Sequence, residues 1–336
     1  MKAVGYRKSL SISDPQSLID VDIETPKPGP RDLRVSVKAV SVNPVDTKVR
    51  MRAAPKDGEP PKVLGYDAAG VVESIGAEVT LFKPDDEVFY AGSIIRPGTN
   101  SELHLVDERI VGRKPKSLSF AQAAALPLTS ITAWEILFDR FCLKREGGNR
   151  GTVLALGGAG GVGSIFIQLA RHVAELTVFA TASRPETREW CLKLGAHHII
   201  DHTKPFADQM KGTGHAEFNY VGGLTFTEQH YPQFAPLFAP QAKLAIIDDP
   251  VIDFKLGKGK SVSYHWESMF TRSMFTTPDM IEQHRLLDAV SKFVDDGMIK
   301  TTLTREMGTI NAANLRTAHA LIESGTSIGK VVLSGW

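Results

Sequence analysis

The chain has 336 residues, of which 42% are apolar, and its formal net charge is +1. This length allows two domains with separate cores, and the near-neutral charge, without a basic run interleaved with aromatic residues, argues against a nucleic-acid-binding surface. No apolar segment approaches the 18 residues of a membrane span, and the start, Met1 to Leu10, lacks the apolar stretch of a secretory signal. Cys142 and Cys191 are too few for a disulfide framework, so we expect a reduced, cytoplasmic protein without membrane or nucleic-acid partners.

The first 120 residues predict short β-strands separated by proline- and glycine-containing turns. The apolar runs lie at 33–42, 63–75, 86–90 and 101–106. Strands this short and regularly spaced are typical of an antiparallel, barrel-like or sandwich-like domain.

From about Ser119 the apolar period becomes helical, and strands then alternate with helices. Strands are predicted at 152–156, 176–182, 216–221, 243–248 and 261–265. Such alternation predicts a parallel sheet with helices on both faces. The tail predicts a helix at 279–296 and then a strand, a helix and a final strand that ends at 329–333.

A glycine-rich turn joins the first of these strands to a helical pattern. Gly158, Gly160 and Gly163 form G-x-G-x-x-G, with Gly161 and Val162 between them. A buried strand, a glycine turn and a helix in this order favour dinucleotide binding, because the free N–H groups at the helix start can hold a pyrophosphate.

The end of the next strand indicates which dinucleotide is bound. An NAD site places an acidic side chain about 20 residues beyond the glycines, but here Ser183 and Arg184 occupy that place. A hydroxyl and a guanidinium suit the 2′-phosphate of NADP. We therefore predict NADPH as the cofactor, with Ser183 and Arg184 in contact with it.

Several motifs in order along the chain resemble the medium-chain dehydrogenase/reductase superfamily, in its zinc-free quinone oxidoreductase-like branch, and within it the zinc-type alcohol dehydrogenase-like proteins. The matching segments are 42–46, 65–72, 83–88, 123–129, 132–134, the glycine turn, 194–196 and 329–333.

This resemblance implies an α/β fold of two parts. A barrel-like (GroES-like), β-rich catalytic domain would comprise residues 1–124 and 270–336, and a Rossmann domain with a doubly wound parallel sheet would comprise residues 125–269 and bind NADP. It also implies a homodimer that forms through an edge of the cofactor domain.

The residues at the metal-ligand positions of zinc-dependent relatives argue against zinc. Asn43 stands where those relatives have Cys, and Tyr66 stands where they have His. The stretch 126–129 offers no Cys or His, whereas catalytic zinc takes three such protein ligands and leaves one position open. His197, His198 and His202 form the other histidine-rich stretch, but they do not share a helix face. We therefore predict no metal.

The residues in place of the metal ligands are the candidate catalytic groups. Hydride transfer develops negative charge on an oxygen, which Tyr66 or Asn43 could stabilise by donating a hydrogen bond. The resemblance implies that Asp46 orients one of them, that Thr129 packs on the nicotinamide ribose and that His202 lies near the 2′-phosphate.

Three functions stay open at this point. The expected one is NADPH-dependent reduction of a quinone or of an activated enone or carbonyl compound. Quinone reductases of this branch have tyrosines after the Asn-Pro segment, and residues 47–55 contain none, so a small enone, aldehyde or ketone fits equally well. The alternatives are a zinc-dependent alcohol dehydrogenase and a cofactor-binding protein with little turnover.

Overall fold

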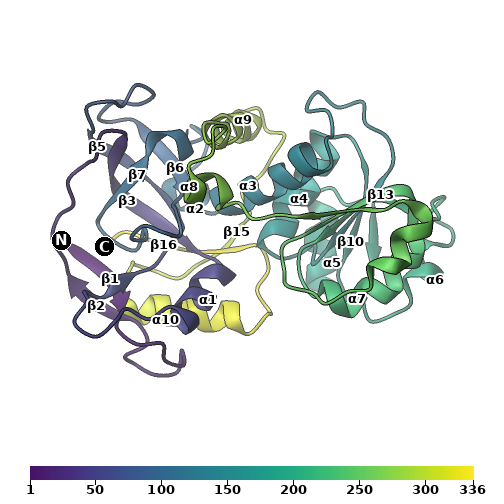
Figure 1. Ribbon diagram of the computed structural model, residues 1–336, viewed down its shortest axis with the longest axis horizontal. Coiled ribbons are helices and arrows are strands. Elements are labelled where there is room, and N and C mark those ends of the chain that lie inside the picture. Colours follow the sequence, from purple (N-terminus) through teal and green to yellow (C-terminus); the bar gives the residue numbers. More distant parts are fainter. The chain divides into compact units, whose positions relative to one another are not determined.

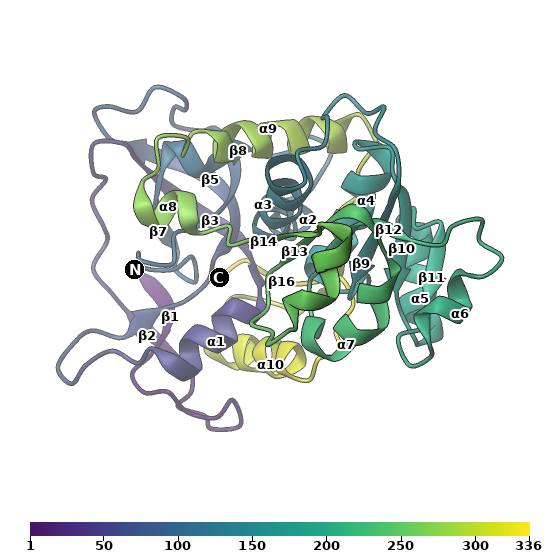
Figure 2. The same cartoon turned by 45° about the vertical axis from the view of Figure 1, so that its right-hand side comes forward.

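The computed structural model describes residues 1–336 and divides them into two compact units (Figures 1 and 2). The first unit comprises Met1–Leu128 and Phe270–Trp336, and the second comprises Thr129–Met269. The fold is therefore built from a discontinuous unit, into which a continuous one is inserted.

The second unit contains a six-stranded parallel sheet in the order β11-β10-β9-β12-β13-β14. Its strands are β9 (Thr152–Leu156), β10 (Thr177–Thr181), β11 (His198–Ile200), β12 (Phe218–Gly223), β13 (Phe238–Ile246) and β14 (Ser263–Trp266). This is the strand order of a dinucleotide-binding Rossmann fold, in which the direction of strand addition reverses beside β9. The predicted α/β fold with a Rossmann sheet is confirmed.

Helices connect these strands and lie along the sheet (Figure 1). They are α4 (Gly161–His172), α5 (Pro185–Lys193), α6 (Phe206–Met210) and α7 (Thr227–Phe234). Another helix, α3 (Pro127–Trp134), and the π-helical segment Glu135–Arg140 that follows it precede β9. The apolar residues at three- and four-residue steps in α4 are buried, because that helix packs on β9 and β10.

The first unit is built on a seven-stranded, largely antiparallel sheet. Its strands run in the order β15-β16-β3-β5-β6-β8, with β7 also paired to β3. The strands are β3 (Asp32–Val42), β5 (Asp67–Ile75), β6 (Glu87–Ala91), β7 (Leu103–Asp107), β8 (Val111–Arg113), β15 (Leu303–Glu306) and β16 (Lys330–Ser334). The sheet is not a closed barrel, and the GroES-like character predicted for this part is confirmed by the family match reported below.

A smaller sheet and five helices complete the first unit. The small sheet has the order β2-β1-β4, with β1 (Lys2–Tyr6), β2 (Ile19–Asp22) and β4 (Lys62–Val63). The helices are α1 (Pro44–Arg52), α2 (Phe120–Ala124), α8 (Thr271–Phe275), α9 (Glu282–Asp295) and α10 (Ala312–Glu323). None of the helices in either unit is long and apolar enough to cross a membrane.

The single strand predicted at 63–75 is wrong, because the chain breaks into β4 and β5. Gly65 has φ +102°, and its carbonyl oxygen accepts a hydrogen bond from Thr99 N at 2.8 Å. A Cβ at Gly65 would lie 2.5 Å from Thr99 Oγ1. The turn that only glycine tolerates here moves Tyr66 out of the strand and places it next to the start of α1.

Candidate active site

The carboxylate of Asp46 joins the start of α1 to the turn that carries Tyr66. Its Oδ2 accepts from Asn43 N at 2.7 Å, and its Oδ1 accepts from Gly65 N at 3.0 Å. Burial, with a contribution from the negative charge of Asp67, raises the pKa of Asp46 to about 7. Asp46 therefore holds the backbone at Asn43 and at the residue before Tyr66.

A second buried carboxylate, that of Asp67, is surrounded by donors. Its Oδ2 accepts from Ser41 Oγ at 2.7 Å, from Asn43 Nδ2 at 2.7 Å and from Lys330 Nζ at 3.1 Å. Its Oδ1 accepts from Leu128 N at 2.7 Å. One side chain at the start of β5 thus connects β3, the start of α1, Leu128 and β16 within the first unit.

Lys330 is the cation of this cluster. Its ammonium donates to Asn43 Oδ1, to Asp67 Oδ2 and, at 3.2 Å, to Val42 O, and the side chain is 3% exposed. Lys330 begins β16, whose next residue, Val331, pairs with Val42 of β3. In the sequence, Lys330 was noted only as part of a family motif. A lysine directly before the apolar run 331–333 is the sequence feature that could have indicated a buried ion pair.

Tyr66 differs from the other buried tyrosines in having a free hydroxyl. The hydroxyls of Tyr6, Tyr90 and Tyr231 have partners in the protein, but the hydroxyl of Tyr66 has none, although its residue is 1% exposed. Its ring packs edge-on against Phe270 at 5.4 Å between centroids. Burial, then the charge of Asp46, raises the pKa of Tyr66, so the phenol keeps its proton and remains a donor.

The side chains at the expected ligand positions do not fit zinc. Both polar atoms of the Asn43 amide are engaged, and the oxygen that could face a metal accepts from the ammonium of Lys330. A divalent cation there would lie beside a buried positive charge. No group of three or more His, Cys, Asp or Glu side chains in the chain could hold a metal ion.

The glycine turn is closely packed at two of its glycines and open at a third. Gly160 precedes α4 in an extended conformation, and a Cβ added there would meet only Gly157 O, at 3.4 Å. A Cβ at Gly158 would lie 2.7 Å from the Cβ of Ala180, and one at Gly163 would lie 2.3 Å from Gly157 O. The turn is therefore packed against the sheet on one side and open at the start of α4, and it fits a dinucleotide cradle.

The residues predicted to contact the adenosine phosphate leave the sheet beside one another. Ala182 N donates to Ile200 O at 2.9 Å, so the chain after β10, with Ser183 and Arg184, runs alongside the end of β11, which precedes His202. Arg184 Nε lies 3.3 Å from an oxygen of Glu186, and both side chains are exposed.

The three histidines His197, His198 and His202 do not lie together in space. Thr129 lies in another part of the same unit. The rings of His197 and His198 lie 6.4 Å apart, whereas His202 lies beside His230, with 5.5 Å between ring centroids. Thr129 is buried in the first turn of α3.

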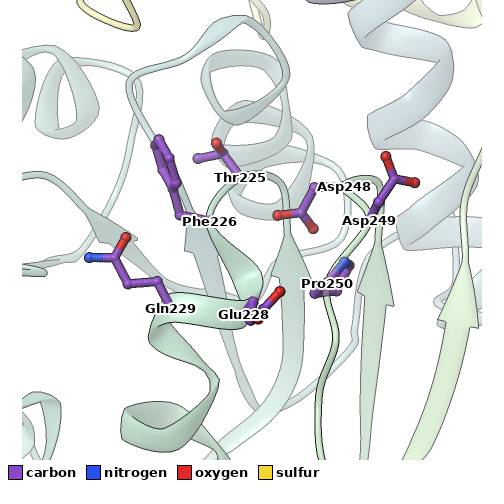
Figure 3. Close-up of a pocket in the computed structure, with 7 residues that line it drawn as sticks. All are labelled: Thr225, Phe226, Glu228, Gln229, Asp248, Asp249 and Pro250. Atoms are coloured by element: carbon purple, nitrogen blue, oxygen red, sulfur yellow. The ribbon is translucent and has the colours of Figure 1, made fainter.

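A pocket of about 480 Å³ lies at the carboxyl ends of β12 and β13 (Figure 3). It is lined by Thr225, Phe226, Glu228, Gln229, Asp248, Asp249 and Pro250. It adjoins the glycine turn, since a Cβ at Gly157 would lie 2.5 Å from Thr225 Cγ2. No motif in the sequence marked these residues, although ligands of open parallel sheets bind at the carboxyl ends of strands.

Two family descriptions match the chain. "Alcohol dehydrogenase GroES-like domain" matches residues 29–127, and "Zinc-binding dehydrogenase" matches residues 194–333. The first match covers most of the antiparallel sheet, and the second begins after α5 and reaches into β16.

Known proteins similar to the chain span its whole length. A zinc-type alcohol dehydrogenase-like protein of Staphylococcus aureus (strain MSSA476) is 39% identical over 340 residues, which cover 99% of this chain and 100% of the relative. A crystal structure from Rhizobium etli CFN 42, provisionally described as a zinc-dependent alcohol dehydrogenase protein, is 58% identical with a TM-score of 0.95, and covers 100% of this chain and 98% of that one. A 2-methylene-furan-3-one reductase of Solanum lycopersicum is 39% identical over 196 residues, 56% of this chain and 49% of that protein.

Proposed function

Because the chain belongs to the alcohol dehydrogenase-like oxidoreductases of the medium-chain dehydrogenase/reductase superfamily, we propose that it is an NADPH-dependent reductase that works without a metal. The hydride would go from NADPH to an electron-poor carbon of a quinone or of an activated enone or carbonyl compound. The observation that carries this proposal is the protonated, unpartnered hydroxyl of Tyr66, at the position where zinc-dependent relatives have a metal ligand.

Tyr66 is proposed as the donor to the oxygen that gains negative charge. A donor that is held in place and has no competing partner stabilises developing charge without reorganising at the moment of reaction. The edge contact with Phe270 restricts the ring, and Asp46 fixes the backbone on its N-terminal side through Gly65.

Asn43 was the other candidate donor, and that role stays a proposal. Its amide has two N–H groups, and one of them is committed to Asp67. The contacts with Lys330 and Asp67 favour a positioning role for Asn43, with at most one N–H left for the substrate oxygen.

The second unit is proposed to hold the cofactor. The nicotinamide would supply the hydride when bound. The open start of α4, with Gly160, Gly161, Val162 and Gly163, would take the pyrophosphate. The pocket beside Thr225 would take the nicotinamide riboside, because its acidic walls suit hydroxyl and amide donors better than phosphates.

One relative supports an enone as the substrate. The tomato relative is named as a reductase of 2-methylene-furan-3-one, which is an enone, and residues 47–55 carry no tyrosine that could stack on a quinone. Consumption of NADPH should therefore be measured against quinones, enones, aldehydes and ketones, with and without a chelator. Turnover that needs zinc would favour an alcohol dehydrogenase, and tight NADPH binding without turnover would favour a binding protein.

Arg184→Ala is expected to weaken NADPH binding by about 1.5–3 kcal/mol, the value of a hydrogen bond to a charged group, and to leave NADH binding nearly unchanged. Dissociation constants for both cofactors measure this effect. The exposed Arg150 provides the matched control, as Arg150→Ala removes an equal charge elsewhere. An equal loss for both cofactors with Arg184→Ala would exclude contact with the 2′-phosphate.

Purified protein is expected to contain well below one zinc ion per chain after dialysis, because the ammonium of Lys330 donates a hydrogen bond to Asn43 Oδ1, the oxygen that could otherwise bind a metal. Elemental analysis measures the content, and activity with and without a chelator provides the control. One zinc per chain, with activity lost on chelation, would contradict a metal-free mechanism.

We also propose that the protein is a cytoplasmic homodimer. The edge strand β14 has β13 as its one partner, and Trp266 at its end is 62% exposed. An unpaired edge beside an exposed aromatic side chain suits pairing with a second copy.

A further inference from the structure

His230 is a buried histidine, and one of its ring nitrogens makes no hydrogen bond. The residue is 6% exposed, and its Nδ1 is buried without a hydrogen-bond partner. Buried polar atoms of folded proteins nearly always have partners, so an orphan of this kind calls for a ligand or a functional reason.

The neighbours of His230 connect it to the predicted phosphate site. Its ring lies 5.5 Å from that of His202 and 5.9 Å from that of Phe206, between centroids. His202 follows the end of β11, and β11 ends beside the segment with Ser183 and Arg184. The ring of His202 therefore connects His230 to the carboxyl edge of the parallel sheet, where the adenosine phosphate is expected.

In the absence of an anion, the surroundings of His230 oppose the protonation of its ring. Burial, then the charge of His202, lowers the pKa of His230. The other charged groups nearby are already paired: Asp201 with Thr203 and Lys204, and Arg184 with Glu186. The first turn of α7 adds Glu228, which accepts from Val251 N. An anion placed at the pair would reverse the balance, because it favours the charged form of both rings.

We propose that His202 and His230 form a proton-linked clamp for the 2′-phosphate of the cofactor, so that binding of NADP(H) takes up a proton that binding of NAD(H) does not. This inference rests on the proposed NADPH function and adds His230 to its recognition site. A phosphate monoester carries up to two negative charges near neutral pH and accepts several hydrogen bonds, which two imidazolium groups can donate. The protein would then bind NADP(H) more strongly as the pH falls toward the ordinary range of histidine.

The test uses two fragments that differ by the 2′-phosphate alone, 2′,5′-ADP and 5′-AMP. Calorimetry in buffers of different ionisation enthalpy measures proton uptake at neutral pH. The parent should take up more protons with 2′,5′-ADP than with 5′-AMP. Its preference for 2′,5′-ADP should change with pH by up to about tenfold per pH unit for each linked proton. The second ionisation of the phosphate itself is common to all variants, so parent and variant are compared at each pH.

His230→Gln should reduce the extra proton uptake and flatten the pH dependence while a preference for 2′,5′-ADP remains through Arg184. His202→Gln, at a more exposed position, should do the same and serves if His230→Gln does not fold. His215→Gln, a histidine elsewhere in the unit, should leave the extra uptake unchanged. If both His230→Gln and His202→Gln took up as many extra protons as the parent, the clamp would be excluded, but the NADPH assignment would stand. Equal affinity of the parent for the two fragments would overturn the NADPH assignment together with the clamp.

Discussion

Lys330→Met is expected to lower the free energy of unfolding by about 3–5 kcal/mol, which is the cost of leaving one member of a buried ion pair without its partner. The ammonium is the one cation bonded to Asp67, and it also holds Asn43 Oδ1 and Val42 O. Methionine fills a similar volume but donates nothing. Chemical denaturation measures the loss.

A double variant separates the charge effect from packing. Lys330→Met with Asp67→Asn removes both charges and should recover part of the loss, since a neutral amide in the buried cluster no longer needs a cation. Lys292→Met removes an exposed lysine paired with Asp296 and should change stability by less than about 1 kcal/mol. If Lys330→Met were as mild as Lys292→Met, the ion pair would not organise the site.

Tyr66→Phe is expected to lower kcat by as much as about 10²–10³, the effect of removing one well-placed donor to a developing oxyanion. NADPH affinity should stay unchanged, because the change removes one oxygen from a residue of the first unit. The fold should also stay intact, since this hydroxyl has no partner in the protein to lose.

Steady-state kinetics on the best substrate, with NADPH affinity measured separately, provide the test. Asn43→Ala should act in the same direction, and the double variant should lose less than the sum if both side chains serve one oxygen. Tyr6→Phe is a matched control, since the hydroxyl of Tyr6 is committed to Val49 O and Ala53 O. A kcat within about twofold of the parent for Tyr66→Phe would show that Tyr66 only packs the core.

The sequence was sufficient for those parts of the fold where local pattern and tertiary structure agree. The glycine turn could be placed because a buried strand precedes it and a helical period follows it, and both are present as β9 and α4. The strand at 63–75 failed because its apolar pattern runs through Gly65, whose positive φ depends on residues 98–100 packing against it. No local pattern records a contact made by a distant segment.

In the candidate site, too, local motifs could be recognised in the sequence, whereas contacts between distant segments could not. The positions of Tyr66, Asn43 and Asp46 in the chain could be predicted from the motifs that surround them. That Asn43 would be held by Lys330 could not, because the two residues are 287 positions apart and meet only when β16 pairs with β3. The orphan Nδ1 of His230 was equally hidden, as it is defined by what surrounds it in space.

Transfer of deuterium from NADPH labelled at the transferring position of the nicotinamide tests the central claim most directly. The enzyme should first be dialysed against a chelator and its zinc content measured. With an enone, aldehyde or ketone as substrate, the reduced product should carry the deuterium on carbon. The rate with labelled NADPH should equal the rate measured with the same label before chelation, although the enzyme holds no stoichiometric zinc. A rate lost on chelation and restored by added zinc, or a product without deuterium, would contradict that claim.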